Sequence, residues 1–123
     1  MSLPEIHARL ANTAMIYCGI LAVWGLFRFF RKEGLSGGYF GAIVVAEILL
    51  VIQGAIGIFL WMGAGRYRPG YVHWLYGFVL VLSAPIVYAY TKGRQDRPEM
   101  LLYAVAYIIM VALVLRATVT GGV

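Results

Sequence analysis

The chain has 123 residues, of which 63% are hydrophobic and 12% are charged. This apolar share exceeds the roughly 45–50% of soluble domains, so an ordinary water-soluble fold is excluded. Ten Lys and Arg against five acids give a net charge of +5. Because the basic residues form short clusters between apolar runs, the charge indicates membrane topology rather than nucleic-acid binding. The single cysteine, Cys18, excludes an internal disulfide.

Four apolar stretches follow one another along the chain, each close to the roughly 20 residues that a membrane-spanning helix needs. Ser2, with Pro4 and Glu5 after it, predicts a capped start for the first helix, and Gly34 and Gly93 predict the ends of the first and third. We therefore expect an all-α, integral membrane four-helix up-and-down bundle, formed as one transmembrane domain over residues 1–123. The expected helices span residues 4–31, 38–62, 70–92 and 98–119.

The basic residues predict how the bundle is oriented. Up-and-down threading places six of them on one side and four on the other. By the positive-inside rule, the first and third connections are cytoplasmic and both termini lie on the outer side. The side with six holds Arg28, Arg31, Lys32, Lys92, Arg94 and Arg97, and the side with four holds Arg9, Arg66, Arg68 and Arg116.

The only two histidines begin helices that run in the same direction. His7 lies 21 residues before Arg28 and His73 lies 19 residues before Lys92. At 1.5 Å per residue, their heights differ by about 3 Å. Two imidazoles at one height can bind one metal, and haem iron needs two protein ligands where zinc needs three or four. The alternative is two unrelated histidines that face the bundle interior.

Small residues follow both histidines along the same helix faces, and two glycines flank Gln53 in the second helix. Such positions leave a slot for a flat macrocycle, although small residues are also common contacts between membrane helices. Gln53 itself can contact the cofactor or form a hydrogen bond between helices. The expected cofactor-binding residues are His7, Ala11, Ala14, Gln53, Gly54, Gly57, His73 and Gly77.

Four arginines are expected on the same side of the membrane as the histidines. Arginine there can pair with the two propionates of a haem, or it can contact lipid headgroups and extend its charged end to the interface. The four are Arg9, Arg66, Arg68 and Arg116.

Three short motifs occur in order: His7 within HARLAN, QGAIG at 53–57, and HWLYG from His73. Over residues 6–92 they resemble one four-helix half of the haem A synthase family of inner-membrane proteins. The resemblance implies one b-type haem per chain, with His7 and His73 as axial ligands, in a cell inner membrane. The paired cysteines and the second half of that family have no counterpart here, so its reaction is not carried over.

These features together predict a membrane b-type cytochrome that transfers electrons. Two alternatives stay open: a haem-handling or minimal haem A synthase-like protein, and a non-haem structural subunit of a larger membrane complex. Whether the chain is an enzyme is undecided, with an electron carrier favoured. Expected partners are the lipid bilayer, haem, a quinone or membrane redox protein, and a second copy of the chain. Glu47, the only acid well inside a span, can relay protons, bind a quinone headgroup, or simply hydrogen-bond to a neighbour.

Overall fold

The computed structural model describes residues 2–63 and 69–121. Within these ranges lie four helices: α1 (Leu3–Phe30), α2 (Gly37–Met62), α3 (Tyr71–Thr91) and α4 (Arg97–Gly121). The described residues contain no β-strand, so the predicted all-α fold is confirmed. Each helix begins and ends within two residues of its predicted range.

All four helices are long and apolar enough to cross a membrane. Their outer surfaces carry large apolar side chains: Ile20 on α1, Phe59 on α2 and Phe78 on α3 are 59%, 68% and 66% exposed. Scattered apolar residues are normal on soluble proteins, but such residues along several helices of one bundle require an apolar surrounding. The chain is an integral membrane four-helix bundle.

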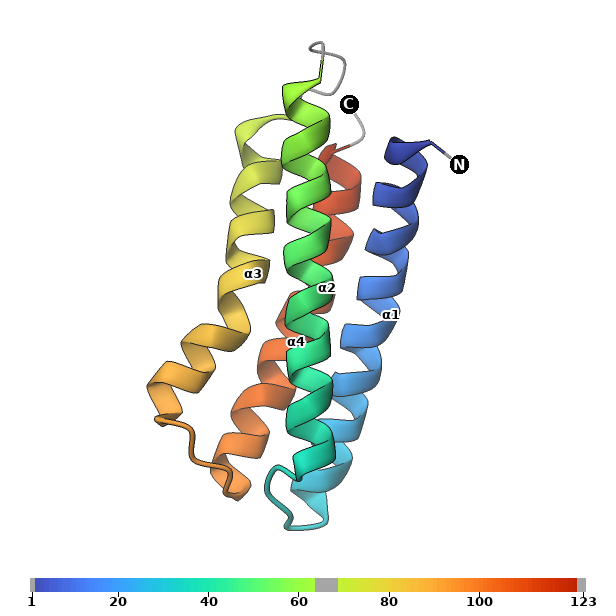
Figure 1. Cartoon of the computed structure of the whole chain (residues 1–123). Helices are drawn as coiled ribbons and strands as arrows, with labels where there is room; N and C mark the ends of the chain where they lie inside the picture. The colour runs from blue at the N-terminus through green and yellow to red at the C-terminus, as the bar shows by residue number, and fades with distance from the viewer. Residues whose placement is uncertain (1, 64–68, 122–123) are drawn as a thin grey trace.

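The helices alternate in direction, and α1 begins at the end of the bundle where α4 finishes (Figure 1). The most extensive packing joins α1 to α4, followed by α3 to α4 and α1 to α2, while α2 and α3 touch least. The helices α1 and α3 therefore lie diagonally opposite each other, as do α2 and α4. Side chains of α1 and α3 can meet only in the centre of the bundle.

The second half of α1 packs closely against α2 and α4. Tyr39 is fully buried there, and its hydroxyl donates to the carbonyl of Leu21 at 2.8 Å. A Cβ on Gly25 would lie 2.8 Å from the hydroxyl oxygen of Tyr39 and 3.0 Å from Cβ of Ala104. Glycine at residue 25 therefore allows α1 to approach both α2 and α4.

Two short loops, residues 31–36 and 92–96, contact each other at the two-loop end of the bundle. The backbone N–H of Leu35 donates to the carbonyl of Gln95 at 2.9 Å. A Cβ on Gly34 would lie only 2.1 Å from the same carbonyl oxygen. The loops can therefore touch only because residue 34 has no side chain.

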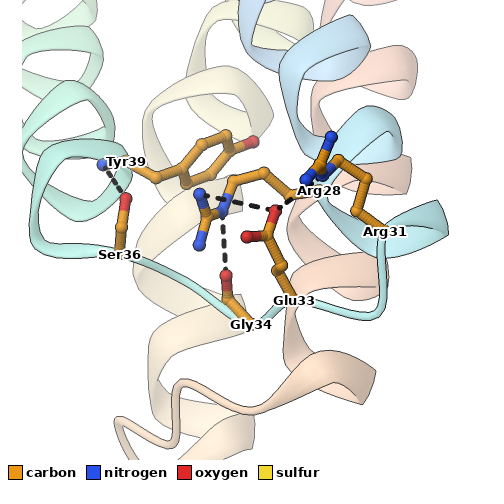
Figure 2. A network of polar contacts seen from close by, with 6 residues as sticks. All are labelled: Arg28, Arg31, Glu33, Gly34, Ser36 and Tyr39. Atoms are coloured by element: carbon orange, nitrogen blue, oxygen red, sulfur yellow. Dashed lines mark hydrogen bonds and ion pairs between the residues drawn. The ribbon is translucent and has the colours of Figure 1, made fainter.

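Polar side chains hold the turn between α1 and α2 (Figure 2). The Nε atom of Arg28 donates to the carbonyl of Gly34 at 2.9 Å, and its guanidinium lies 4.0 Å from the Glu33 carboxylate. The hydroxyl oxygen of Ser36 accepts from the N–H of Tyr39 at 3.0 Å and caps α2. The charge of Arg28 predicts a position at the membrane surface. In the structure, its guanidinium is held by contacts with Gly34 and Glu33 of the same chain.

The helix ends test the capping predictions. The Ser2 hydroxyl oxygen accepts from the N–H of Glu5 at 3.3 Å, so the cap of α1 is confirmed. Gly93 follows the last residues of α3 with φ of +75°, a value that favours glycine, and that prediction is also confirmed. The prediction for Gly34 is wrong, because α1 already ends at Phe30 with Arg31 as its C-cap, and Gly34 serves the contact between the loops.

Candidate cofactor site

Two histidines from diagonally opposite helices meet at the end of the bundle opposite the two loops, which we call the histidine end. His7 lies in the second turn of α1 and His73 in the first turn of α3. Their ring centroids are 6.4 Å apart, and the ring planes form an angle of 65°, so the rings are not stacked. Both residues are half-buried. The rings meet across the bundle, as their calculated heights predict.

The separation of the two rings suits one metal ion between them. An imidazole nitrogen bonds a metal at about 2.0–2.1 Å and lies about 1.1 Å from the ring centre, which puts two opposed imidazoles about 6.3 Å apart. The observed 6.4 Å agrees with that value. Two opposed imidazoles are also the complete protein ligand set of a six-coordinate haem iron.

The hydrogen bond of His73 fixes which of its nitrogens can bind a metal. Its Nδ1 atom lies 2.9 Å from the carbonyl oxygen of Ala117 in α4. Because a carbonyl only accepts, Nδ1 carries the hydrogen, and the lone pair of the neutral ring is on Nε2. Histidines that bind metals commonly donate their other N–H to a backbone carbonyl in this way.

The helix that carries Gln53 lies against His7. A Cβ on Gly57 would lie 3.2 Å from Cε1 of His7, so residue 57 must stay small for the ring to keep its position. The side-chain amide of Gln53 donates to the backbone carbonyl of His7 at 2.6 Å. The expected hydrogen bond between helices is therefore present. The Gln53 side chain also interacts with the imidazole of His7, while its other amide atom, Oε1, is buried with no hydrogen bond of regular geometry among the described residues.

A cavity of about 1050 Å³ lies around the two rings and is bounded by all four helices. Its volume lies just above the usual range for small-molecule and cofactor sites, about 300–1,000 Å³. Its walls are mainly aliphatic, aromatic and glycine residues, as is usual for such sites. Eight of the predicted cofactor-binding residues line it: His7, Ala11, Ala14, Gln53, Gly54, Gly57, His73 and Gly77.

One side of the cavity reaches the outer surface of the bundle. Ala55 and Ile58 of α2, and Leu75 and Phe78 of α3, line the cavity and are themselves exposed. These are the two helices that pack least against each other. A bound molecule on this side would therefore contact the hydrocarbon region of the membrane directly.

The structure describes two of the four arginines predicted to pair with propionates. Arg9 and Arg116 are exposed, and neither lines it. Since Arg9 follows the cavity-lining Ala8, it is turned by about 100° around α1 from that residue. Arg66 and Arg68 lie outside the described residues.

The remaining ionisable candidates lie away from the cavity. Glu47 is half-buried and does not line it, and Cys18 is buried in the apolar core. In residues 2–63 and 69–121, no group of three or more His, Cys, Asp or Glu side chains converges. The two histidines are therefore the chemically distinctive feature of this end of the bundle.

Sequence reasoning assigned only Arg116 of α4 to the site and missed the residues of α4 that line the cavity. Val114, Ala117 and Thr118 form part of the cavity wall, and the carbonyl of Ala117 orients His73. A backbone carbonyl leaves no signal in a sequence, because every residue has one. The spacing of Val114, Ala117 and Thr118, three and four residues apart, does place them on one helix face.

No family model, curated protein or solved structure matches this chain. The resemblance to haem A synthase in the motifs at His7, Gln53 and His73 therefore stays a prediction. The function is argued below from the geometry of the cavity.

Proposed function

We propose that the protein is a small membrane b-type cytochrome, with one haem bound between α1 and α3 and with His7 and His73 as its axial ligands. The observation that carries this proposal is the 6.4 Å between the two imidazole centroids, because it agrees with two rings bound to one metal ion. The cavity around the rings, with its small and apolar walls, supports it further.

Each residue of the proposed site has a defined task. His73 would bind through Nε2 while its Nδ1–H donates to Ala117, which holds the ring in one orientation. Gly57 leaves room for the ring of His7, and the Gln53 amide donates to the backbone carbonyl of His7, which holds this part of α1 against α2. The apolar walls bury the site and exclude water from it. Burial and the exclusion of water are among the factors that set the redox potential of a bound haem.

A haem bound in this way supplies reversible one-electron transfer between ferric and ferrous iron. With both axial positions filled by histidine, no position is left for oxygen or a substrate, which favours electron transfer over catalysis at the iron. Membrane-soluble quinones and membrane redox proteins are the corresponding electron partners. The excess of basic residues at the two-loop end favours an inner-membrane orientation with that end in the cytoplasm and both termini outside.

The test is the absorption spectrum of the purified protein after haem is added, oxidised and then reduced. We expect sharp α and β bands in the reduced protein, and we expect them to disappear in His7→Ala and in His73→Ala. Asn12→Ala is a suitable control, because Asn12 is an exposed polar residue of α1 that does not line the cavity. Bands that persist in either histidine variant would remove that histidine from the ligand set. A wild-type protein that stays colourless would favour a structural subunit instead.

A second function, transient haem handling or a minimal haem A synthase-like activity, is favoured by the exposed side of the cavity between α2 and α3. A cofactor that contacts lipid can leave without unfolding the bundle. The two functions differ in how long haem is retained. Transfer of haem to an excess of apoglobin within minutes would favour handling, and retention over many hours would favour the cytochrome.

A further inference from the structure

Glu47 of α2 and Tyr107 of α4 lie at the same height inside the bundle. Glu47 is ten residues after Gly37, and Tyr107 is ten residues after Arg97, the first residues of their helices at the two-loop end. At 1.5 Å per residue, both lie about 15 Å from that end. The two side chains interact electrostatically although their helices are diagonally opposite. Both therefore reach into the space between the helices.

Each of these side chains has a buried polar atom with no hydrogen-bond partner in the described part of the chain: Oε1 of Glu47 and the hydroxyl oxygen of Tyr107. Tyr107 is 0% exposed, so lipid and bulk water do not reach it. A buried polar group without a hydrogen-bond partner destabilises a folded protein. Two such groups at one height that do not bond each other can share a bridging molecule, and water is the usual one.

The surroundings of Glu47 disfavour a negative charge. The ion pairs of the described residues involve other acids. Besides Glu47, the groups that interact with Tyr107 are Tyr17, Cys18 and Tyr39, none of which is a cation. The helices α2 and α3 contain no Lys or Arg. An unpaired carboxylate is costly in this setting, whereas a protonated carboxyl is neutral and gains an O–H donor.

From this geometry we propose that Glu47 and Tyr107 form a buried proton-binding site, in which the protonated carboxyl and the phenol both donate to one ordered water molecule. Water accepts two such bonds and still has two hydrogens to donate. An acceptor is available at the same height: Val81 lies ten residues from the two-loop end of α3, and Pro85 has no N–H for its carbonyl. The site lies one helical turn beneath Leu50, a residue of the cavity wall.

The proposal is tested by infrared spectroscopy of the protein in lipid bilayers, without haem. At neutral pH we expect a C=O stretching band of a protonated carboxyl, displaced when H₂O is replaced by D₂O. The band should be lost in Glu47→Gln. It should remain in Glu33→Gln, a matched control at a helix end, where Glu33 is paired with Arg28 and Arg31. Absence of the band from the wild type, or its survival in Glu47→Gln, would overturn the proposal.

The role of Tyr107 is tested separately. In Tyr107→Phe the phenol hydroxyl is removed from the hydrogen-bonded group that contains the Glu47 carboxyl. The C=O band of Glu47 should therefore move to higher frequency, while the circular dichroism of the helices stays unchanged. A band that does not move would remove Tyr107 from the site. If a variant does not fold, wild-type protein with ¹³C-labelled glutamate shows whether the band belongs to a glutamate. Of the four glutamates, Glu33 and Glu99 are ion-paired and Glu5 is exposed, so a glutamate band is assigned to Glu47. None of these measurements depends on haem, so the cytochrome proposal can fail while this one holds.

Discussion

Gly57 in α2 faces the imidazole of His7 in α1 so closely that a Cβ on residue 57 would lie 3.2 Å from Cε1 of that ring. If the ring of His7 were displaced, its two ring nitrogens would move with it, and these are the atoms that can bind a metal. The position of one proposed ligand is therefore set by the absence of a side chain on the neighbouring helix.

Gly57→Ala is expected to weaken haem binding by about tenfold or more, the lower part of the range for changes to groups that orient metal ligands. The measurement is a titration of the purified protein with haem, followed by absorbance. Gly41→Ala is the control, because a Cβ there meets no atom within 4 Å and Gly41 does not line the cavity. Equal affinity in the two variants would show that the ring of His7 is not held by this contact.

Gly54→Ala and Gly77→Ala test whether the cavity holds the macrocycle. Both glycines line the cavity, and a Cβ on either would meet no protein atom within 4 Å. The protein without haem should therefore fold as the wild type does, with unchanged helix content and thermal stability. Haem affinity should fall, because the added methyl groups occupy the space of the cofactor. Wild-type affinity in both variants would place the haem elsewhere.

The tautomer of His73 can be measured before any haem is added. Because its Nδ1 donates to the carbonyl of Ala117, the neutral ring should carry its hydrogen on Nδ1. Nitrogen chemical shifts from protein labelled with ¹⁵N-histidine distinguish the two tautomers, and His7→Ala assigns the signals. A neutral ring with its hydrogen on Nε2 would contradict both this hydrogen bond and the proposed metal-binding nitrogen.

The sequence was sufficient to predict the four helices and the meeting of the two histidines, because both follow from regular distances along a helix. Apolar runs of membrane length set the spans, and a fixed rise per residue sets the heights of His7 and His73. The lining positions Ala11, Ala14 and Gly77 follow from the same periodicity, since residues three and four apart share a face.

Contacts made across the bundle could not be predicted in this way. The bond from His73 to Ala117 depends on how α3 and α4 pack, and the orphaned hydroxyl of Tyr107 depends on what its neighbours leave unsatisfied. Arg9 was assigned to the site by its side of the membrane alone, which does not determine the face of a helix. Gly34 was read as a helix end, although its role depends on Gln95, far along the chain.

Gly25→Ala should destabilise the bundle by about 1–3 kcal/mol, the usual cost of adding a methyl group to a well-packed core. The new Cβ would lie 2.8 Å from the Tyr39 hydroxyl oxygen and 3.1 Å from the terminal methyl carbon of Met100. Thermal unfolding in detergent, followed by circular dichroism, measures the loss. Gly41→Ala provides the comparison, since its added methyl group contacts nothing. Equal stability of the two variants would mean that α1 can move away from Tyr39 at no cost.

Gly34→Ala separates stability from cofactor binding, because the two-loop end lies far from the histidines. Its Cβ would lie 2.1 Å from the carbonyl oxygen of Gln95, so the loops must part and the Leu35 hydrogen bond to that carbonyl must break. We expect a loss of about 1–3 kcal/mol, because the N–H of Leu35, a buried residue, loses its acceptor. Gly38→Ala is the control, with its nearest atom at 3.8 Å. The reduced haem spectrum should stay that of the wild type while thermal stability falls. A changed spectrum would mean that strain at the loops is transmitted along α1 to His7.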